Sequence, residues 1–123
     1  PQNKVYCEDD TVVYRLEVSV DEKEAARLDG AGRVFLDRGE AKYVLIDIRR
    51  STDFSSAARK RWVGFLQHPN IIKTAIFGGS TFIRTLVLFV IGATRRKNIK
   101  FFGTEQEARA WLHTTDAETK NAA

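Results

Sequence analysis

From Tyr43 onward, strand-like and helix-like segments alternate along the chain, and this alternation limits the fold more than any other feature. The run YVLIDI at Tyr43–Ile48 is nearly all apolar, as is typical of a central strand covered on both faces. Further strand signals follow at Ile71–Phe77 and Ile99–Phe102, with helical spacing of apolar residues from about Ser55 to His68 and from Ser80 to about Thr94. Strands separated by helices pair in parallel through right-handed crossovers, so we expect an α/β fold.

The N-terminal part adds an antiparallel element. Val5–Cys7 and Thr11–Val18 read as strands joined by an acidic turn, Glu8-Asp9-Asp10, and they predict a hairpin. Ser19 and Glu22 have the spacing of a capping box, so a helix is expected to begin near Val20 and to run to about Arg38. The expected architecture is a mixed sheet of about five strands, with helices as crossovers.

The C-terminal part repeats a helix-start signal. Thr104 and Glu107 have capping-box spacing, and Ala108, Trp111 and Leu112 form the apolar face of a final helix. With 123 residues, of which 43% are hydrophobic and 29% charged, we expect one domain over residues 1–123, with residues 113–123 as a flexible tail.

Nothing in the sequence indicates export. No apolar stretch approaches the roughly 20 residues that span a bilayer, so no transmembrane segment is predicted. A single cysteine, Cys7, excludes an internal disulfide, and a basic start with an apolar run is absent. We therefore expect a cytoplasmic protein.

The positive charge is concentrated in the middle of the chain. Residues 49–100 carry 11 Lys and Arg against 1 acid, whereas the segments on either side are net acidic. A solvated basic face is the plain interpretation, and an acidic protein, a phosphate or an anionic lipid is the functional one. Nucleic acid has little support, because the aromatic residues of this segment are not interleaved with its charges.

Asp47 is the exception within the central strand. A buried carboxylate needs a partner, and Arg59 or Arg84 could provide one, so a structural ion pair is favoured over catalysis. No second carboxylate is placed to act with it, and the two histidines, His68 and His113, are not at metal-ligand spacing. We expect no enzyme activity, no cofactor and no metal.

Several segments together point to a known family. YVLIDIRR followed by a Ser-rich turn and a helix, then IFGGSTFIR, then KFFGTEQEARAWL, resembles the SpoIIAA-like and STAS-related bacterial domains. The likeness covers most of the chain and is strongest over Tyr43 to Leu112. It implies a SpoIIAA-like fold and a regulatory role through protein contacts.

The resemblance also implies candidate residues. Anti-sigma-factor antagonists carry a phosphorylated serine after the corresponding strand, and Ser55 and Ser56 lie near that place here. An ordinary helix cap is the plain interpretation of the same serines. Members of the wider fold, including CRAL-TRIO domains, bind lipids, which by analogy keeps a ligand in view.

The segment Gly78-Gly79-Ser80-Thr81 is a strand, turn and helix start. Backbone N–H groups around Gly79, Ser80 and Thr81 could hold an anion, with Arg84 one turn later. It lacks the lysine and the spacing of a P-loop, and a plain turn and cap is the alternative.

The helix from Ser80 is more apolar than a one-sided surface helix requires. The inward arc is predicted to contain Phe82, Ile83, Leu86, Val87, Val90 and Ala93. Phe89 and Ile91 widen it, and Leu88 falls on the opposite side. Deep burial, a homodimer contact or a lipid contact at Leu88, Phe89 and Ile91 would each account for the excess.

Three function classes follow. The leading hypothesis is a non-enzymatic, STAS-like regulatory or protein-interaction module that offers a basic edge to an acidic or anionic partner. The alternative is a binding protein for a lipid or another amphipathic ligand. An enzyme using Asp47 is the weakest reading, because no nucleophile, base and orienting group occur together.

Overall fold

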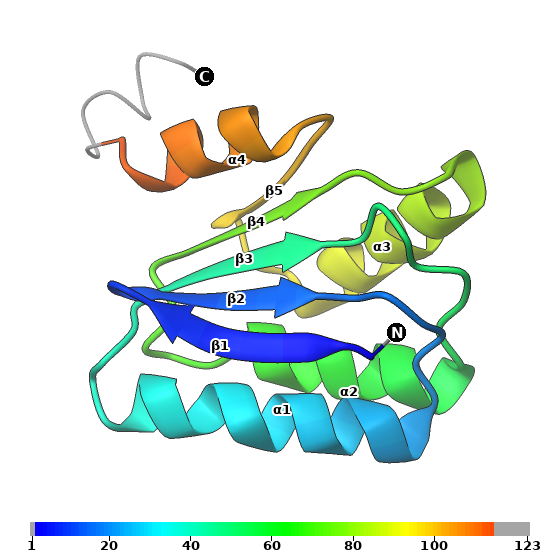
Figure 1. The fold of residues 1–123 in the computed structure, drawn as a ribbon, viewed down its shortest axis with the longest axis horizontal. Coiled ribbons are helices and arrows are strands. Elements are labelled where there is room, and N and C mark those ends of the chain that lie inside the picture. Colours follow the sequence, from blue (N-terminus) through cyan, green and yellow to red (C-terminus); the bar gives the residue numbers. More distant parts are fainter. Residues whose placement is uncertain (1, 115–123) are drawn as a thin grey trace.

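The chain forms one mixed sheet covered by helices on both faces (Figure 1). A computed structural model describes residues 2–114 of the sequence. The sheet has the strand order β1-β2-β3-β4-β5, in which β1 pairs with β2 antiparallel and every other pair is parallel. The strands are β1 (Lys4–Glu8), β2 (Thr11–Arg15), β3 (Tyr43–Asp47), β4 (Lys73–Phe77) and β5 (Ile99–Phe102). The predicted α/β class, the N-terminal hairpin and the five-stranded mixed sheet are confirmed.

Within the described residues 2–114, four helices connect and cover the strands. They are α1 (Glu22–Asp37), α2 (Ser56–Leu66), α3 (Thr81–Thr94) and α4 (Glu105–Leu112). Alternate strand residues face opposite sides, so Val12, Val44 and Ile76 pack with the first three helices, whereas Val13, Leu45 and Phe77 pack with α4. Figure 1 shows α4 on the far side of the sheet from α1 and α2. The larger core therefore lies under α1, α2 and α3.

A buried aromatic cluster joins the sheet to α1 and α2. Tyr14, Trp62 and Phe65 meet edge to face, with ring centroids 5.1 to 5.6 Å apart. The Tyr14 hydroxyl donates to the Leu28 carbonyl at 2.8 Å. A Cβ on Gly32 would overlap that hydroxyl, so this glycine lets α1 approach the sheet. Gly32 is thus a packing requirement inside a continuous helix.

The prediction for the start of α1 is wrong. The helix begins at Glu22 and its cap is Asp21, whose side chain accepts the Glu24 N–H at 2.8 Å. Val20 cannot be helical because it forms an isolated parallel bridge with Phe54. The Ser19 capping box is therefore not used.

The second strand is also shorter than predicted. It ends at Arg15, because the backbone N–H groups of Glu17 and Val18 donate to the Asn3 side chain at 2.7 and 3.0 Å. At the other end of the chain, His113 caps α4. A flexible tail was predicted for residues 113–123, and all of it after Thr114 lies outside the described residues.

Candidate functional site

The carboxyl ends of the parallel strands meet at one edge, where ligands bind in open α/β sheets. Within residues 2–114 four connections follow these strand ends, and we call the first three, residues 16–21, 48–55 and 78–80, the loop edge; the fourth is residues 103–104. Val20 N–H donates to the Asp53 carbonyl and Ser55 N–H to the Val20 carbonyl, both at 3.0 Å. The middle connection is therefore fixed to the first one by backbone hydrogen bonds.

The middle connection also touches the third. Gly78 and Gly79 have φ of 87° and 88°, in the left-handed region that favours glycine. A Cβ on Gly78 would overlap the Arg49 side chain, and one on Gly79 would lie 3.0 Å from Ile48 Cδ1. The two glycines therefore let the β4–α3 turn pack against the start of the β3–α2 loop.

Asp47 ends β3 beneath this edge, and its carboxylate is fully occupied. Oδ1 accepts the backbone N–H of Arg49 at 3.0 Å and its Nε at 3.1 Å, and Oδ2 accepts Arg49 Nη2 at 2.8 Å and Arg15 Nη1 at 3.0 Å. The partners predicted from the sequence, Arg59 and Arg84, are wrong. The register explains why: Arg15 lies directly opposite Asp47 across the β2–β3 pair.

A second carboxylate joins the same network, and the sequence reasoning missed it. Glu105, at the start of α4, accepts Arg15 Nη1 at 2.7 Å and Nη2 at 3.0 Å, and Arg109 Nε at 2.8 Å. Arg109 also pairs with Glu8 at 2.9 Å. These six residues (Glu8, Arg15, Asp47, Arg49, Glu105 and Arg109) form the ion-pair network, which ties α4 to β1, β2 and β3.

The network keeps both carboxylates ionised. Burial acts to raise the pKa of Asp47, but hydrogen bonds from Arg49 and Arg15 outweigh it and hold this pKa below its ordinary value. The Arg15 hydrogen bonds, assisted by Arg109, lower the pKa of Glu105 to about 2 against the effect of burial. Carboxylates with lowered pKa values, which accept four hydrogen bonds at Asp47 and three at Glu105, are poor proton carriers at neutral pH.

The two candidate serines differ in what their hydroxyls do. Ser55 caps α2, and its Oγ accepts the Ala58 N–H at 3.1 Å. Ser56 is the first residue of α2 and its side chain is exposed. Ser56 is thus the more exposed of the two residues, and phosphorylation of either stays a prediction.

The glycine turn has the geometry of an ordinary helix start. Ser80 caps α3 by accepting the Ile83 N–H at 3.3 Å, and Thr81 opens the helix. The Arg84 guanidinium lies 4.8 Å from the centroid of the Phe101 ring, on β5. Anion binding at Gly79, Ser80, Thr81 and Arg84 stays a prediction.

An apolar cavity lies between the sheet and the helices that start at this edge. Its volume is about 30 Å³, and its walls come from β3, β4, α2, α3 and the connections that follow β2 and β3. Arg59 is the charged residue in its lining, and the Arg59 Nη1 donates to the Phe54 carbonyl at 2.7 Å. The Trp62 ring also lines it, and Trp62 Nε1 is buried with no hydrogen-bond partner.

Helix α3 is less buried than the sequence predicted. Its buried residues are Ile83, Val87 and Thr94, while Phe82, placed in the inward arc from the sequence, is 59% exposed. Ala93 is exposed as well. The helix packs chiefly on α2, so only a narrow strip of it reaches the core.

The residues predicted to form a dimer or lipid contact differ in their exposure. Leu88 is 50% exposed and Phe89 73% exposed, whereas Ile91 is partly buried against the larger core. Deep burial does not account for the apolar excess of α3.

Part of the basic middle segment serves the fold. The buried Lys73 donates its Nζ to the Trp111 and Thr114 carbonyls at 3.0 and 2.8 Å, at the C-terminal end of α4. Arg96 donates to the carbonyls of Gln67, His68 and Ile71. These two cations bind backbone carbonyls within the fold. Fewer positive charges are therefore available to a partner than the 11 Lys and Arg of residues 49–100 suggest.

Over residues 2–114, no three His, Cys, Asp or Glu side chains are grouped as metal ligands, and no helix is long and apolar enough to cross a bilayer. The lone cysteine, Cys7, lies in β1, where its Sγ is within 3.3 Å of the Asp9 carbonyl.

Comparison with known proteins agrees with the fold. The chain superposes on the anti-sigma factor antagonist SpoIIAA in its unphosphorylated form with a TM-score of 0.69 at 15% identity, covering 92% of this chain and 99% of that one. An anti-sigma factor antagonist from Mycobacterium paratuberculosis gives 0.67 at 18% identity, with 92% and 94% covered. An uncharacterized DUF3478-family protein with a SpoIIAA-like fold from Shewanella loihica PV-4 gives 0.65 at 18% identity, with 89% and 91% covered.

No curated protein matches the chain by sequence. The SpoIIAA-like family model matches residues 11–113, which contain β2 to β5 and all four helices. The chain belongs to the SpoIIAA-like family.

Proposed function

We propose that the chain is a non-enzymatic regulatory module that binds another protein through the loop edge. The observation that carries this proposal is the saturation of Asp47, the one acid that ends a central strand there. With four hydrogen bonds to arginine groups, it has no free lone pair for a substrate. The exposed groups that remain at this edge are suited to contact rather than to chemistry.

The charge of the loop edge favours an acidic partner. The Arg49 and Arg50 side chains are 58% and 79% exposed, and among residues 2–114 the acid nearest to Arg50 is Glu17, at 3.7 Å. Arg49 also holds the Asp47 carboxylate, whereas Arg50 adds little to stability, and both exposed cations steer the approach of an acidic surface. The similarity in fold to anti-sigma factor antagonists is consistent with a protein partner for this chain.

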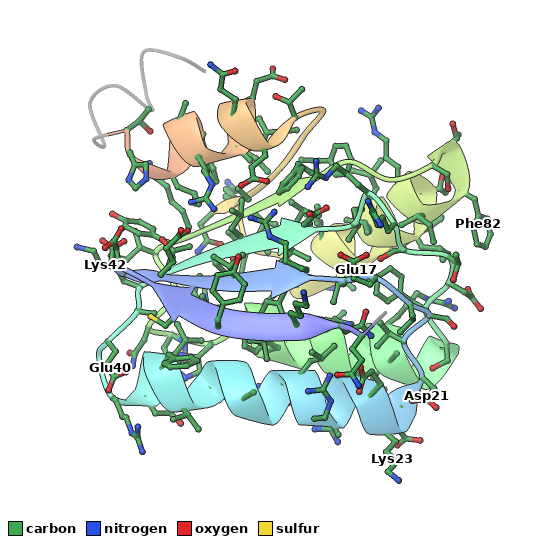
Figure 2. The ribbon with its side chains drawn as sticks, in the orientation of Figure 1. Glu17, Asp21, Lys23, Glu40, Lys42 and Phe82 are labelled. Atoms are coloured by element: carbon green, nitrogen blue, oxygen red, sulfur yellow. The ribbon has the colours of Figure 1, made fainter. Side chains whose placement is uncertain are left out.

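Affinity capture with matched variants tests the proposal. Arg50→Glu reverses a charge at the loop edge, and Lys42→Glu reverses one at the opposite end of the sheet; Figure 2 shows Lys42 and Phe82 on opposite sides of the molecule. We expect a protein that is retained by the wild type and by Lys42→Glu, and lost with Arg50→Glu. Retention by all three chains would contradict the loop edge as the contact surface.

Phosphorylation would then act at Ser56. Its hydroxyl is exposed at the first turn of α2, where added negative charge is favoured by the helix dipole, whereas the Ser55 hydroxyl is engaged as the cap. After incubation with ATP and lysate of the source organism, intact mass should rise by one phosphate in the wild type and in Ser55→Ala, but not in Ser56→Ala. A phosphoform that persists in Ser56→Ala would refute this assignment.

The apolar cavity supports a second candidate function, the binding of an amphipathic ligand. Arg59 could pair with an acidic head group, and the unpartnered Trp62 Nε1 could donate to a polar atom of the ligand. A cavity of about 30 Å³ holds about one or two waters, so an acyl chain would need α3 to move outward.

Native mass spectrometry after gentle purification distinguishes the two candidates. A copurifying small molecule that is lost with Val87→Trp, which fills the cavity, would favour ligand binding. A wild-type chain whose mass equals its sequence mass would remove this second candidate and leave the protein-binding proposal intact.

A further inference from the structure

We propose that the outward face of α3 binds the surface of an anionic membrane. This face is defined by Phe82, Thr85, Leu88, Phe89, Gly92 and Ala93, and we call it the α3 face. All six residues are exposed. The proposal goes beyond the loop edge, because it adds a second surface with a different kind of partner.

The apolar part of the α3 face is large for a surface helix. Phe82 and Phe89 are 59% and 73% exposed and lie seven residues apart, two turns along the same side of α3. Leu88 is 50% exposed on the adjoining side. Figure 2 shows Phe82 projecting away from the body of the molecule. Exposed phenylalanines on one side of a helix are typical of helices that lie in a membrane interface.

The surrounding charge has one sign. Residues 54–104 contain nine Lys and Arg and no Asp or Glu. Arg84 flanks the α3 face, and Arg95 and Lys97 follow at its C-terminal end, where both are exposed. Among the described residues, neither Arg95 nor Lys97 has an ion-pair partner within 4.0 Å. These cations are available to an anionic surface.

The α3 face suits a bilayer better than another protein. Specific docking of proteins needs directional hydrogen bonds around an apolar centre, but the Thr85 hydroxyl already donates to the Thr81 carbonyl at 2.9 Å. A second copy of this chain would bring Arg84, Arg95 and Lys97 toward their own equivalents, since a two-fold contact is self-complementary. Binding to an anionic bilayer requires only apolar side chains next to cations.

Cosedimentation with lipid vesicles tests the proposal on the full chain. The probes are vesicles of phosphatidylcholine alone and of phosphatidylcholine mixed with phosphatidylglycerol. We expect binding to the mixed vesicles only, and weaker binding as salt is raised, because salt screens the exposed cations.

Matched variants assign the binding to the α3 face. Phe82→Ser with Phe89→Ser should reduce the partition coefficient about tenfold or more, and Arg95→Gln with Lys97→Gln should reduce it about fivefold per cation removed. The controls are Val34→Ser with Ile72→Ser, at two exposed apolar residues elsewhere, and Lys23→Gln with Arg38→Gln, in α1 and at its C-cap; neither should change binding. Melting temperatures verify that each variant is folded.

Three outcomes would overturn the proposal. The first is equal binding to both kinds of vesicle or to neither. The second is a loss of binding in the control variants as large as in the α3 variants. The third is a concentration-dependent dimer in sedimentation equilibrium that Phe82→Ser with Phe89→Ser dissociates, because a second copy would then cover the α3 face.

Discussion

Removing the negative charge of Glu105 should destabilise the fold in a pH-dependent way. Glu105 receives three hydrogen bonds from Arg15 and Arg109 and connects α4 to the sheet. The Arg15 hydrogen bonds lower its pKa from an ordinary value of 4.5 to about 2. We expect Glu105→Gln to lower the free energy of unfolding at pH 7, because the amide cannot form the same ion pairs.

The magnitude follows from the pKa. At about 1.36 kcal/mol per pKa unit, the full difference would be about 3.4 kcal/mol. Water screens the pair, since the Glu105 side chain is 28% exposed, and this reduces the expected loss to about 2 kcal/mol. A lowered pKa in the folded state stabilises the protein above the unfolded pKa, and this contribution is lost as pH falls from about 4.5 toward 2.

Urea unfolding followed by tryptophan fluorescence measures the effect, because Trp62 and Trp111 lie on opposite faces of the sheet. The difference between wild type and Glu105→Gln should be about 2 kcal/mol from pH 7 to 5 and should shrink below pH 4.5. Glu40→Gln, at an exposed acid at the opposite end of the sheet from the loop edge (Figure 2), should change stability by a few tenths of a kcal/mol. A difference that does not vary with pH, or an equal loss in Glu40→Gln, would refute the reasoning.

Three further substitutions test packing by urea unfolding at pH 7. Gly32→Ala should cost about 2 kcal/mol by overlapping the Tyr14 hydroxyl, and adding Tyr14→Phe should recover part of the loss; equal stability of the single and double variants would contradict the overlap. Gly79→Ala should cost about 1 to 2 kcal/mol, because its φ of 88° and the nearby Ile48 both oppose a Cβ; a neutral result would contradict strain at this turn. Lys73→Met should cost about 2 kcal/mol by removing the charged hydrogen bonds from Nζ to the Trp111 and Thr114 carbonyls, and an unchanged midpoint would contradict that role.

Periodicity and turn chemistry were enough to predict the architecture. The apolar run at Tyr43–Ile48 became β3, and the Ser80 and Thr104 caps begin α3 and α4 where expected. The Ser19 capping box failed because Val20 is held extended by its bridge to Phe54, a contact between residues far apart in sequence. Local signals cannot report such a contact.

The candidate site was less predictable for a related reason. Asp47 was recognised as a buried acid, but its partner Arg15 is set by the register of β2 against β3, and Glu105 comes from a helix on the opposite face from α2. The helical spacing predicted Phe82 to face inward because a wide buried arc was assumed, whereas α3 buries only Ile83, Val87 and Thr94. The apolar excess of that helix was visible from the sequence, but its exposure depends on how α3 packs on α2.

The central claim is that this SpoIIAA-like chain contacts a protein partner through the loop edge. Hydrogen–deuterium exchange of the chain alone and in complex with the protein recovered by affinity capture tests it most directly. The prediction is slower exchange in residues 48–56 and 78–82, with α1 unchanged. Protection confined to α1, or no change in residues 48–56, would contradict it.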